Sequence, residues 1–290
     1  MEKTMHPTLE ELLDQGPVLL DGGWGTELQH RGLALDGCAE HWNLTRPQSV
    51  EQVAWAYMDA GARILLTNTF RGNRLALKSH GLGEQVADIN TAGVAIAQRA
   101  ARHGCRVFGS LGPSGLDVSA NRVSWTAIED CFREQAALLA DGGVEGLVIE
   151  TMVDPTELRC AVLAAQDTGL PVVGCLVIPG LDSDTDQQTW GPAVEMLEAV
   201  GVDVIGANCG CDIGESIAVC RMLKSLTDLP LWLKPNAGLP TLVAGRPVYQ
   251  NPLWQAARYV SGMRDAGAQF FGGCCGTTPE FIRACAVANQ

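Results

Sequence analysis

The sequence predicts an α/β fold, a (β/α)8 TIM barrel that residues 1–290 form as a single domain. Two observations lead to this prediction. Short, continuously apolar segments recur along the chain, and each is followed by a segment with helical periodicity. The length of 290 residues, with 47% hydrophobic residues and 33 glycines, suits such a barrel. A doubly wound open sheet is the alternative, but it would need fewer strands.

The predicted strands lack the apolar–polar alternation of a strand that has one face in water. Continuous apolar character is typical of strands buried on both faces, as in a parallel sheet. Each run ends in glycine or a polar residue. The eight runs are 17–23, 62–70, 106–113, 145–152, 171–178, 203–210, 231–238 and 269–276.

Between the strands, apolar residues recur three to four positions apart, as on one face of a helix. Segment 47–61 shows the pattern, and its last residue, Gly61, can end the helix. Two polar segments, 113–125 and 179–190, follow strands and are expected to be loops on the face where barrels carry active sites. The other predicted helices are 84–104, 126–143, 154–169, 192–201, 214–226, 252–267 and 278–290.

Composition and charge exclude several classes of partner and location. The chain has 20 Lys and Arg against 33 Asp and Glu, a net charge of −13, with no basic run. We therefore expect no nucleic-acid partner. The first residues form no apolar signal sequence, and the apolar runs have only strand length, so we expect no membrane contact and a cytoplasmic protein. The 11 cysteines, an odd number, favour reduced thiols over a disulfide framework.

Three cysteines stand where predicted strands end. Cys209 ends the sixth strand in GANCG, and the adjacent Cys274 and Cys275 end the eighth in GGCCG. Carboxyl ends of barrel strands converge on one mouth, so three thiolates can occupy three corners of a zinc tetrahedron. The surrounding glycines would let both adjacent sulfurs turn toward one ion. The alternatives are a vicinal disulfide, two buried thiols without a metal, or Cys211 as a competing ligand.

Three protein ligands leave a fourth position open, which is typical of catalytic rather than structural zinc. A Zn²⁺ ion with three thiolates is electron-rich, so it is poorly suited to polarising a carbonyl or generating hydroxide. It suits a fourth sulfur ligand, which loses its proton and stays nucleophilic. The predicted chemistry is alkyl transfer to a zinc-bound substrate thiolate, with no protein base assigned.

Six motifs occur in one order along the chain: DGGWGTEL (21–28), LLTNTF (65–70), IETM (149–152), GANCG (206–210), KPNAG (234–238) and GGCCGTTPE (272–280). Together they resemble the homocysteine S-methyltransferase family, over about residues 15–290. That family includes the homocysteine domain of cobalamin-dependent methionine synthase, betaine–homocysteine methyltransferases and S-methylmethionine-dependent enzymes.

The resemblance implies homocysteine as acceptor and the three cysteines as zinc ligands. It also implies that two carboxylates, Asp21 and Glu150, hold the substrate ammonium, as charge complementarity would favour. Asp21 as a turn residue and Glu150 as the partner of a buried donor are the alternatives. Backbone N–H groups around Gly22, Gly23 and Thr67 suit the substrate carboxylate. The expected substrate-binding residues are Asp21, Gly22, Gly23, Thr67, Asn68 and Glu150.

The methyl donor must carry methyl on a good leaving group: a quaternary ammonium, a sulfonium or methylcobalt. Aromatic faces bind quaternary ammonium. Arg71 stands where animal betaine enzymes have a tyrosine, whereas EHWN and TNTF look like short bacterial betaine-dependent enzymes and KPNAG like methionine synthase. We expect betaine or a related onium first, a methylcorrinoid on a separate protein second, and S-methylmethionine or S-adenosylmethionine third. The donor-pocket candidates are Trp24, Phe70, Trp42 and Asn236.

Overall fold

The computed structural model describes residues 5–118, 124–177, 185–243, 246–249 and 253–289. Eight strands of the described chain pair in parallel, and each lies within one of the predicted apolar runs or extends it by two residues. They are β1 (Val18–Leu19), β2 (Ile64–Leu66), β3 (Arg106–Leu111), β4 (Leu147–Met152), β5 (Val172–Leu176), β6 (Val204–Asp212), β7 (Leu231–Asn236) and β10 (Phe270–Phe271).

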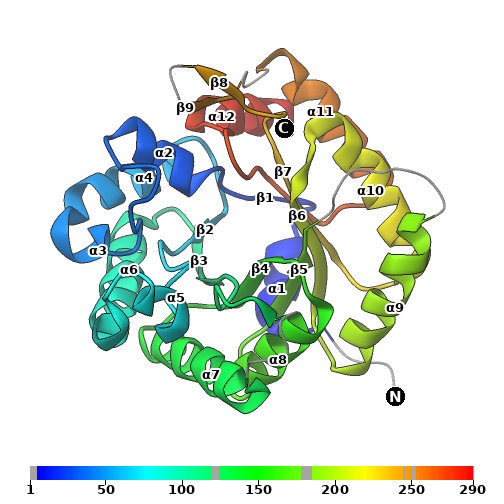
Figure 1. The fold of residues 1–290 in the computed structure, drawn as a ribbon. Coiled ribbons are helices and arrows are strands. Elements are labelled where there is room, and N and C mark those ends of the chain that lie inside the picture. The colour runs from blue at the N-terminus through cyan, green and yellow to red at the C-terminus, as the bar shows by residue number, and fades with distance from the viewer. Residues whose placement is uncertain (1–4, 119–123, 178–184, 244–245, 250–252, 290) are drawn as a thin grey trace.

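The strands form a ring with helices around it (Figure 1). Their order is β1-β10-β7-β6-β5-β4-β3-β2, and a parallel bridge from Leu20 to Ile64 brings β2 back beside β1. The predicted TIM barrel is therefore confirmed. Because β10 and β6 both neighbour β7, the ends of the sixth and eighth predicted strands lie near each other.

Alternate strand residues fill the barrel interior, as the two-residue period of a strand requires. The short helix α1 (Pro7–Leu13) closes the N-terminal end of the barrel and is seen within the ring in Figure 1. Its Leu9 and Leu12 belong to the interior cluster. The strand residues of that cluster are Val18, Leu20, Ile64, Leu66, Phe108, Val148, Val173, Cys175, Val204, Trp232 and Phe270.

All eight predicted helices are present and pack their apolar faces on the outside of the barrel. No helix in the described ranges combines the length and the apolar character needed to cross a bilayer. The bounds are α4 (Pro47–Asp59), α6 (Val86–Ala100), α7 (Trp125–Asp141), α8 (Pro155–Gln166), α9 (Thr185–Ala199), α10 (Ile213–Leu226), α11 (Ala256–Ala266) and α12 (Pro279–Ala288).

Short elements that the sequence did not indicate lie between these. They are the helices α2 (Trp24–His30), α3 (Trp42–Thr45) and α5 (Arg74–Lys78), the 3-10 turns Gly83–Gln85 and Leu253–Gln255, and the antiparallel hairpin of β8 (Thr241–Val243) and β9 (Arg246–Val248).

The predicted loop 179–190 is partly wrong. Helix α9 begins at Thr185 and contains Pro192, whereas the sequence predicts Pro192 as the helix start because proline favours the first turn. The remainder of that loop lies outside the described residues. In the other predicted loop, 113–125, the described residues 113–118 contain no strand or α-helix and Ser124 caps the next helix, but Trp125 is already the first residue of that helix.

Candidate active site

The three predicted metal ligands come together at the carboxyl ends of the strands. The sulfur atoms of Cys209, Cys274 and Cys275 all lie within 4.8 Å of one another, and those of Cys209 and Cys275 are 4.0 Å apart. A tetrahedral zinc ion with Zn–S bonds of about 2.3 Å would hold its sulfur ligands about 3.8 Å apart. The cluster therefore fits a single tetrahedral ion.

The end of β6 turns the Cys209 side chain toward the cluster. Cys209 has a φ of 55°, in the left-handed region that non-glycine residues rarely adopt, and the register with β7 shifts here. The preceding Asn208 fixes this turn, because its side-chain oxygen accepts from Thr151 N (2.7 Å) and its amide donates to Thr151 Oγ1 (2.7 Å). The same amide donates to the Cys274 sulfur at 3.8 Å. Asn208 thus joins β4, β6 and the cysteine pair.

The chain after β10 brings two adjacent thiols to one side. Neighbouring side chains on a regular strand point to opposite faces, but the strand has ended before Cys274. The N–H of Cys275 donates to Asn236 Oδ1 at 3.1 Å, and its C=O accepts from Ala237 N. A Cβ on Gly273 would lie 2.2 Å from the Thr277 hydroxyl, so only glycine fits this turn.

Hydrogen bonds within the cluster favour one thiolate even without a metal. Hydrogen bonding with Cys209, then with Cys274, and with the Tyr249 phenol lowers the pKa of Cys275. The pKa of Cys209 is raised by its hydrogen bonds to Cys274 and Cys275. Metal ligation by cysteine requires thiolates, and Cys275 is the member of the cluster that ionises most readily without a metal.

Two of the three alternatives for the cysteines, the vicinal disulfide and Cys211 as a ligand, are not found in the structure. All eleven cysteines are free, so Cys274 and Cys275 form no vicinal disulfide. Cys211 is buried in the apolar layer between the barrel strands and the surrounding helices, which we call the outer core. It lies outside the three-sulfur group.

A cavity of about 240 Å³ lies against the cluster at the barrel mouth. Most predicted substrate and donor residues border it, but Asp21, Thr67, Trp42 and Asn236 do not. It is lined by Gly22, Gly23, Trp24, Gly25, Thr26, Ala39, Glu40, Leu66, Asn68, Phe70, Glu150, Thr151, Cys209, Lys234, Cys274 and Cys275.

Asp21 lies behind the cavity wall, with 0% of its surface exposed. Its Oδ1 accepts from Lys234 Nζ at 2.5 Å. Its Oδ2 accepts from Trp24 Nε1 at 2.7 Å and from Leu66 N at 2.8 Å. The carboxylate therefore already has three donors within the protein, one of which is a cation.

Glu150, at the end of β4, does face the cavity. The Ser110 hydroxyl donates to its Oε1 at 2.5 Å. Burial raises the pKa of Glu150 to about 7, although the nearby Lys234 acts in the opposite direction. A cationic ligand would stabilise the ionised form of a carboxylate in this environment, because a nearby positive charge lowers the pKa.

Lys234 was not predicted as a site residue. It lies in β7 with 2% of its side chain exposed. Burial alone would lower the pKa of Lys234, but Asp21 and Glu150 outweigh it and raise the pKa, so the ammonium stays charged. A signal was present in the sequence: lysine within the apolar run LWLKP must have a buried partner.

Two of the backbone groups expected to bind the substrate carboxylate are already engaged. Gly23 N donates to Thr277 O at 3.0 Å, and Thr67 N donates to Phe108 O at 3.0 Å. The predicted Asn68 borders the cavity, but its amide donates to Ala39 O and to the side chain of a neighbouring asparagine. Asn68 thus ties the loop that carries Ala39 to the end of β2.

Glu40 is a second site residue that the sequence reading missed. It lines the cavity and is 2% exposed. Its Oε1 accepts from Arg71 N at 2.8 Å, and its Oε2 accepts from the Cys38 thiol at 3.4 Å. No ion pair to Glu40 is found among the described residues. The donors to its two carboxylate oxygens are both neutral groups. The signal was the acidic residue in EHWN, directly before a helix.

The four donor-pocket candidates divide into two pairs. Trp24 and Phe70 line the cavity. Trp42 packs in the outer core, with the Arg46 guanidinium 4.7 Å from its ring centre. Asn236 supports the Cys275 backbone instead of bordering the cavity. The aromatic wall is therefore smaller than the sequence suggested.

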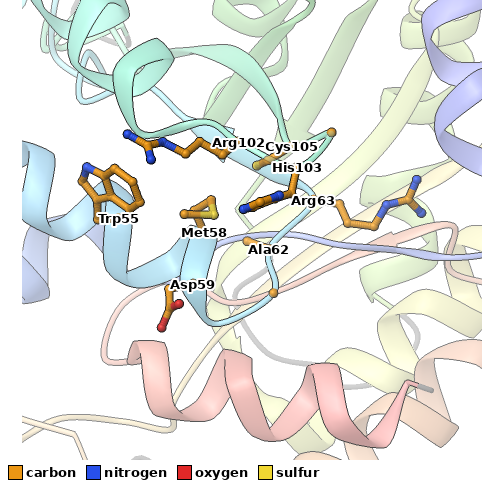
Figure 2. A pocket seen from close by; sticks show the side chains of 10 residues that line it. Trp55, Met58, Asp59, Ala62, Arg63, Arg102, His103 and Cys105 are labelled. Carbon is orange, nitrogen blue, oxygen red and sulfur yellow. The ribbon is translucent and has the colours of Figure 1, made fainter.

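A second cavity, of about 380 Å³, lies at the amino ends of β2 and β3, and none of the three clustered cysteines lines it. The Arg102 guanidinium lies 4.3 Å from the Trp55 ring centre, and Figure 2 shows Arg63 extending away from both. Asp59 at its edge pairs with Arg283. Its positive groups do not converge, and barrel enzymes carry their chemistry on the opposite face.

Comparisons with known proteins agree with this geometry. Residues 18–288 match the model of the family described as homocysteine S-methyltransferase. The chain is 32% identical to a methionine synthase of Mycobacterium leprae and 33% identical to one of Mycobacterium tuberculosis, over 97% and 99% of its length. It spans only about a quarter of those relatives, 25% and 26%.

A solved structure with similar extent is the metallated form of the homocysteine methyltransferase MmuM from Escherichia coli. It superposes with a TM-score of 0.79 and 26% identity, over 96% of this chain and 99% of that one. The chain therefore belongs to the homocysteine S-methyltransferase family, a family of S-methyl-transferring enzymes, which confirms the prediction from the motifs.

Proposed function

We propose that the protein transfers a methyl group from an onium donor, with betaine as the first candidate, to the thiol of homocysteine and so forms methionine. The observation that carries this proposal is the three-sulfur cluster, which forms one wall of a cavity that also presents Glu150 and Lys234. The candidate metal ligands thus share one cavity with an acidic and a basic side chain, which complement the charged groups of an amino acid.

Zinc is the metal we propose for Cys209, Cys274 and Cys275. A zinc ion held by these sulfurs would supply an open fourth position at which a thiol binds and loses its proton. The fit rests on the sulfur separations and on the soft donor set, which favours zinc over hard cations.

The protein's own residues would orient the acceptor and shield it. Glu150 would pair with the acceptor's ammonium, and the buried walls of the cavity would exclude water from the sulfur. Methyl transfer is an in-line displacement: the sulfur–carbon bond forms as the bond from carbon to the leaving group breaks. Positioning the two reactants is therefore the main contribution of the chain.

An onium donor is supported by other residues that line the same cavity as the cysteines. Glu40 offers a buried carboxylate that no cation balances among the described residues, and Phe70 and Trp24 offer aromatic faces in the same cavity. A carboxylate beside aromatic rings is suited to a methylated cation. Net charge of the whole chain, −13, is compatible with a cationic donor.

We further propose that residues 1–290 act as one domain, and that the protein works in the cytoplasm, because its many free thiols suit a reducing compartment. The methionine synthase relatives favour a second candidate, in which a separate corrinoid protein delivers the methyl group to this barrel. S-methylmethionine as donor is a further outcome of the test below, and another small thiol is the alternative acceptor if homocysteine gives no product with any donor.

The test is methionine formation by reduced, zinc-loaded protein from homocysteine, with glycine betaine, S-methylmethionine and a methylcorrinoid in separate reactions. We expect turnover with betaine. Glu40→Gln should raise KM for betaine by about 10-fold, since a charge-assisted contact is lost, while homocysteine KM stays unchanged. Turnover only with S-methylmethionine or methylcorrinoid would replace the ammonium donor. No turnover with any donor would reject homocysteine methylation as the function.

A further inference from the structure

We infer that Asn208 is a positioning residue that sets the distance between the metal ligands and Glu150, and thereby the length of the acceptor that the site binds. The inference rests on the proposed function in one respect, namely that the acceptor places its sulfur on the metal and its ammonium at Glu150. Asn208 itself is buried and does not line the cavity, so it would act through its neighbours.

The side chain of Asn208 joins two strands that are not neighbours in the barrel, since β5 lies between β4 and β6. In β6, it accepts from Thr151 N and donates to Thr151 Oγ1 on β4, both at 2.7 Å. Regular strand pairing is interrupted at both places. The register of β4 with β5 shifts between Ile149 and Met152, and that of β6 with β7 shifts between Asn208 and Asp212. The two side-chain hydrogen bonds therefore fix the spacing of β4 and β6 where the strand ladder does not.

The backbone on both sides of this contact is strained. Thr151 has a φ of 61° and Cys209 a φ of 55°, in the left-handed region that is least favourable for a β-branched residue such as threonine. Such conformations persist only where surrounding contacts hold them. Asn208 holds Thr151 directly and precedes Cys209 in the chain. Without its amide, we expect both residues to relax and their side chains to shift.

The two strained residues stand next to the groups that the acceptor would contact. Thr151 directly follows Glu150, and Cys209 is one of the candidate metal ligands; all three line the cavity. The Asn208 amide also donates to the Cys274 sulfur at 3.8 Å. One buried side chain thus connects the carboxylate end of the site with the sulfur cluster.

A site that holds both ends of a flexible acceptor at a fixed distance selects the acceptor's length. Homocysteine has two methylene groups between its sulfur and the carbon that bears the ammonium. Cysteine has one, and 2-amino-5-sulfanylpentanoate has three. An acceptor binds with its full affinity only where a preorganised site lets both ends reach their partners together. Asn208 would hold the two partners at the spacing that suits two methylene groups.

The test measures the affinities of these three L-amino-acid thiols by calorimetry, with reduced protein that carries one zinc ion per chain, so it needs no methyl donor. One methylene group corresponds to a factor of about 10 to 200 in discrimination. We expect wild type to prefer homocysteine over both homologues by such a factor. Asn208→Ala should reduce both preferences to less than about 5-fold, chiefly by weakening homocysteine.

Thr151→Val tests the same contact from the other strand. It removes the hydroxyl that accepts from Asn208 but keeps the Thr151 N–H, so it should lose part of the preference. Asn208→Ala/Thr151→Val should match Asn208→Ala, because both substitutions remove one shared contact. If Asn208→Ala does not retain zinc, Thr151→Val, which leaves the bond to Cys274 in place, carries the test.

The matched control is Asn90→Ala. Asn90 is equally buried, its amide donates to Gly72 O and to Val86 O, each at 2.8 Å, and it does not line the cavity. This variant should lose stability and keep the wild-type preference, because its contacts lie outside the site.

Three results would overturn the inference. They are wild-type preferences in both Asn208→Ala and Thr151→Val, a wild-type protein that binds the three thiols equally, and a loss of preference in Asn90→Ala as large as in Asn208→Ala. The last result would trace the effect to general loosening of the barrel. Failure of the proposed function is distinct from these, because wild-type protein would then bind none of the three thiols.

Discussion

The buried pair of Lys234 and Asp21 allows a stability prediction with a definite size. Their side chains are 2% and 0% exposed, so Lys234→Met leaves an aspartate charge in the barrel without its cation. Breaking a buried pair by removing one partner costs about 3–5 kcal/mol. The two remaining donors, Trp24 and Leu66 N, favour the lower end of this range. At about 2–4 °C per kcal/mol, Tm should fall by about 6–20 °C.

Urea and thermal unfolding of the metal-free protein measure this cost. Asp21→Asn/Lys234→Met should recover to within about 2 kcal/mol of wild type, because removing a whole buried pair is often close to neutral. Arg283→Met is the control, since Arg283 pairs with Asp59 at the surface and should change stability by less than about 1 kcal/mol. The reasoning is refuted if Lys234→Met matches this control.

Three further predictions concern the cysteines, Glu150 and the glycine turn. Cys209→Ala should lose the zinc, whereas Cys211→Ala, two residues away in the outer core, should keep one ion per chain; equal zinc content by elemental analysis would contradict the assignment. Burial raises the pKa of Glu150 from 4.5 to about 7, so the folded state holds this proton more tightly and loses stability as pH rises across that interval. Glu150→Gln should therefore gain about 3 kcal/mol relative to wild type in metal-free protein between pH 4.5 and pH 8, measured by urea unfolding; a pH-independent difference would disprove it. Gly273→Ala should weaken zinc binding at least 10-fold in a chelator competition, because its Cβ would meet a hydroxyl at 2.2 Å, while Gly25→Ala, which meets nothing within 4 Å, should not; similar affinities in the two variants would refute the steric argument.

Residues at strand ends were predictable because barrel topology alone brings those ends together. Cys209 and the adjacent pair Cys274 and Cys275 are 65 residues apart or more, yet parallel strands on either side of β7 place them in one group. The spacing of the apolar runs was enough to predict this grouping. It sets the order of the strands, and parallel strands of a barrel all end at the same mouth.

Residues whose role depends on a distant partner were not predictable in the same way. Lys234 and Asp21 are separated by 213 positions, and nothing local shows which carboxylate meets the lysine. Side-chain direction was equally hidden: Trp24 and Trp42 are each the first residue of a short helix, but Trp24 borders the cavity and Trp42 packs in the outer core.

Backbone dihedral angles that depend on side-chain contacts could not be predicted either. Cys209 and Thr151 both have positive φ, and Asn208 bonds to Thr151 to hold this arrangement, which no propensity indicates. The short helix α1 was missed because seven residues give little periodicity, and its apolar side chains serve to close the barrel rather than to form an outer face.

The measurement that tests the central claim most directly is X-ray absorption at the zinc edge of the reduced protein, without and with homocysteine. The account predicts three sulfur atoms at about 2.3 Å from zinc without homocysteine, and four with it. Fewer than three sulfur atoms without homocysteine, or a count that homocysteine leaves unchanged, would contradict a centre in which Cys209, Cys274 and Cys275 hold the metal and the acceptor's sulfur completes its coordination.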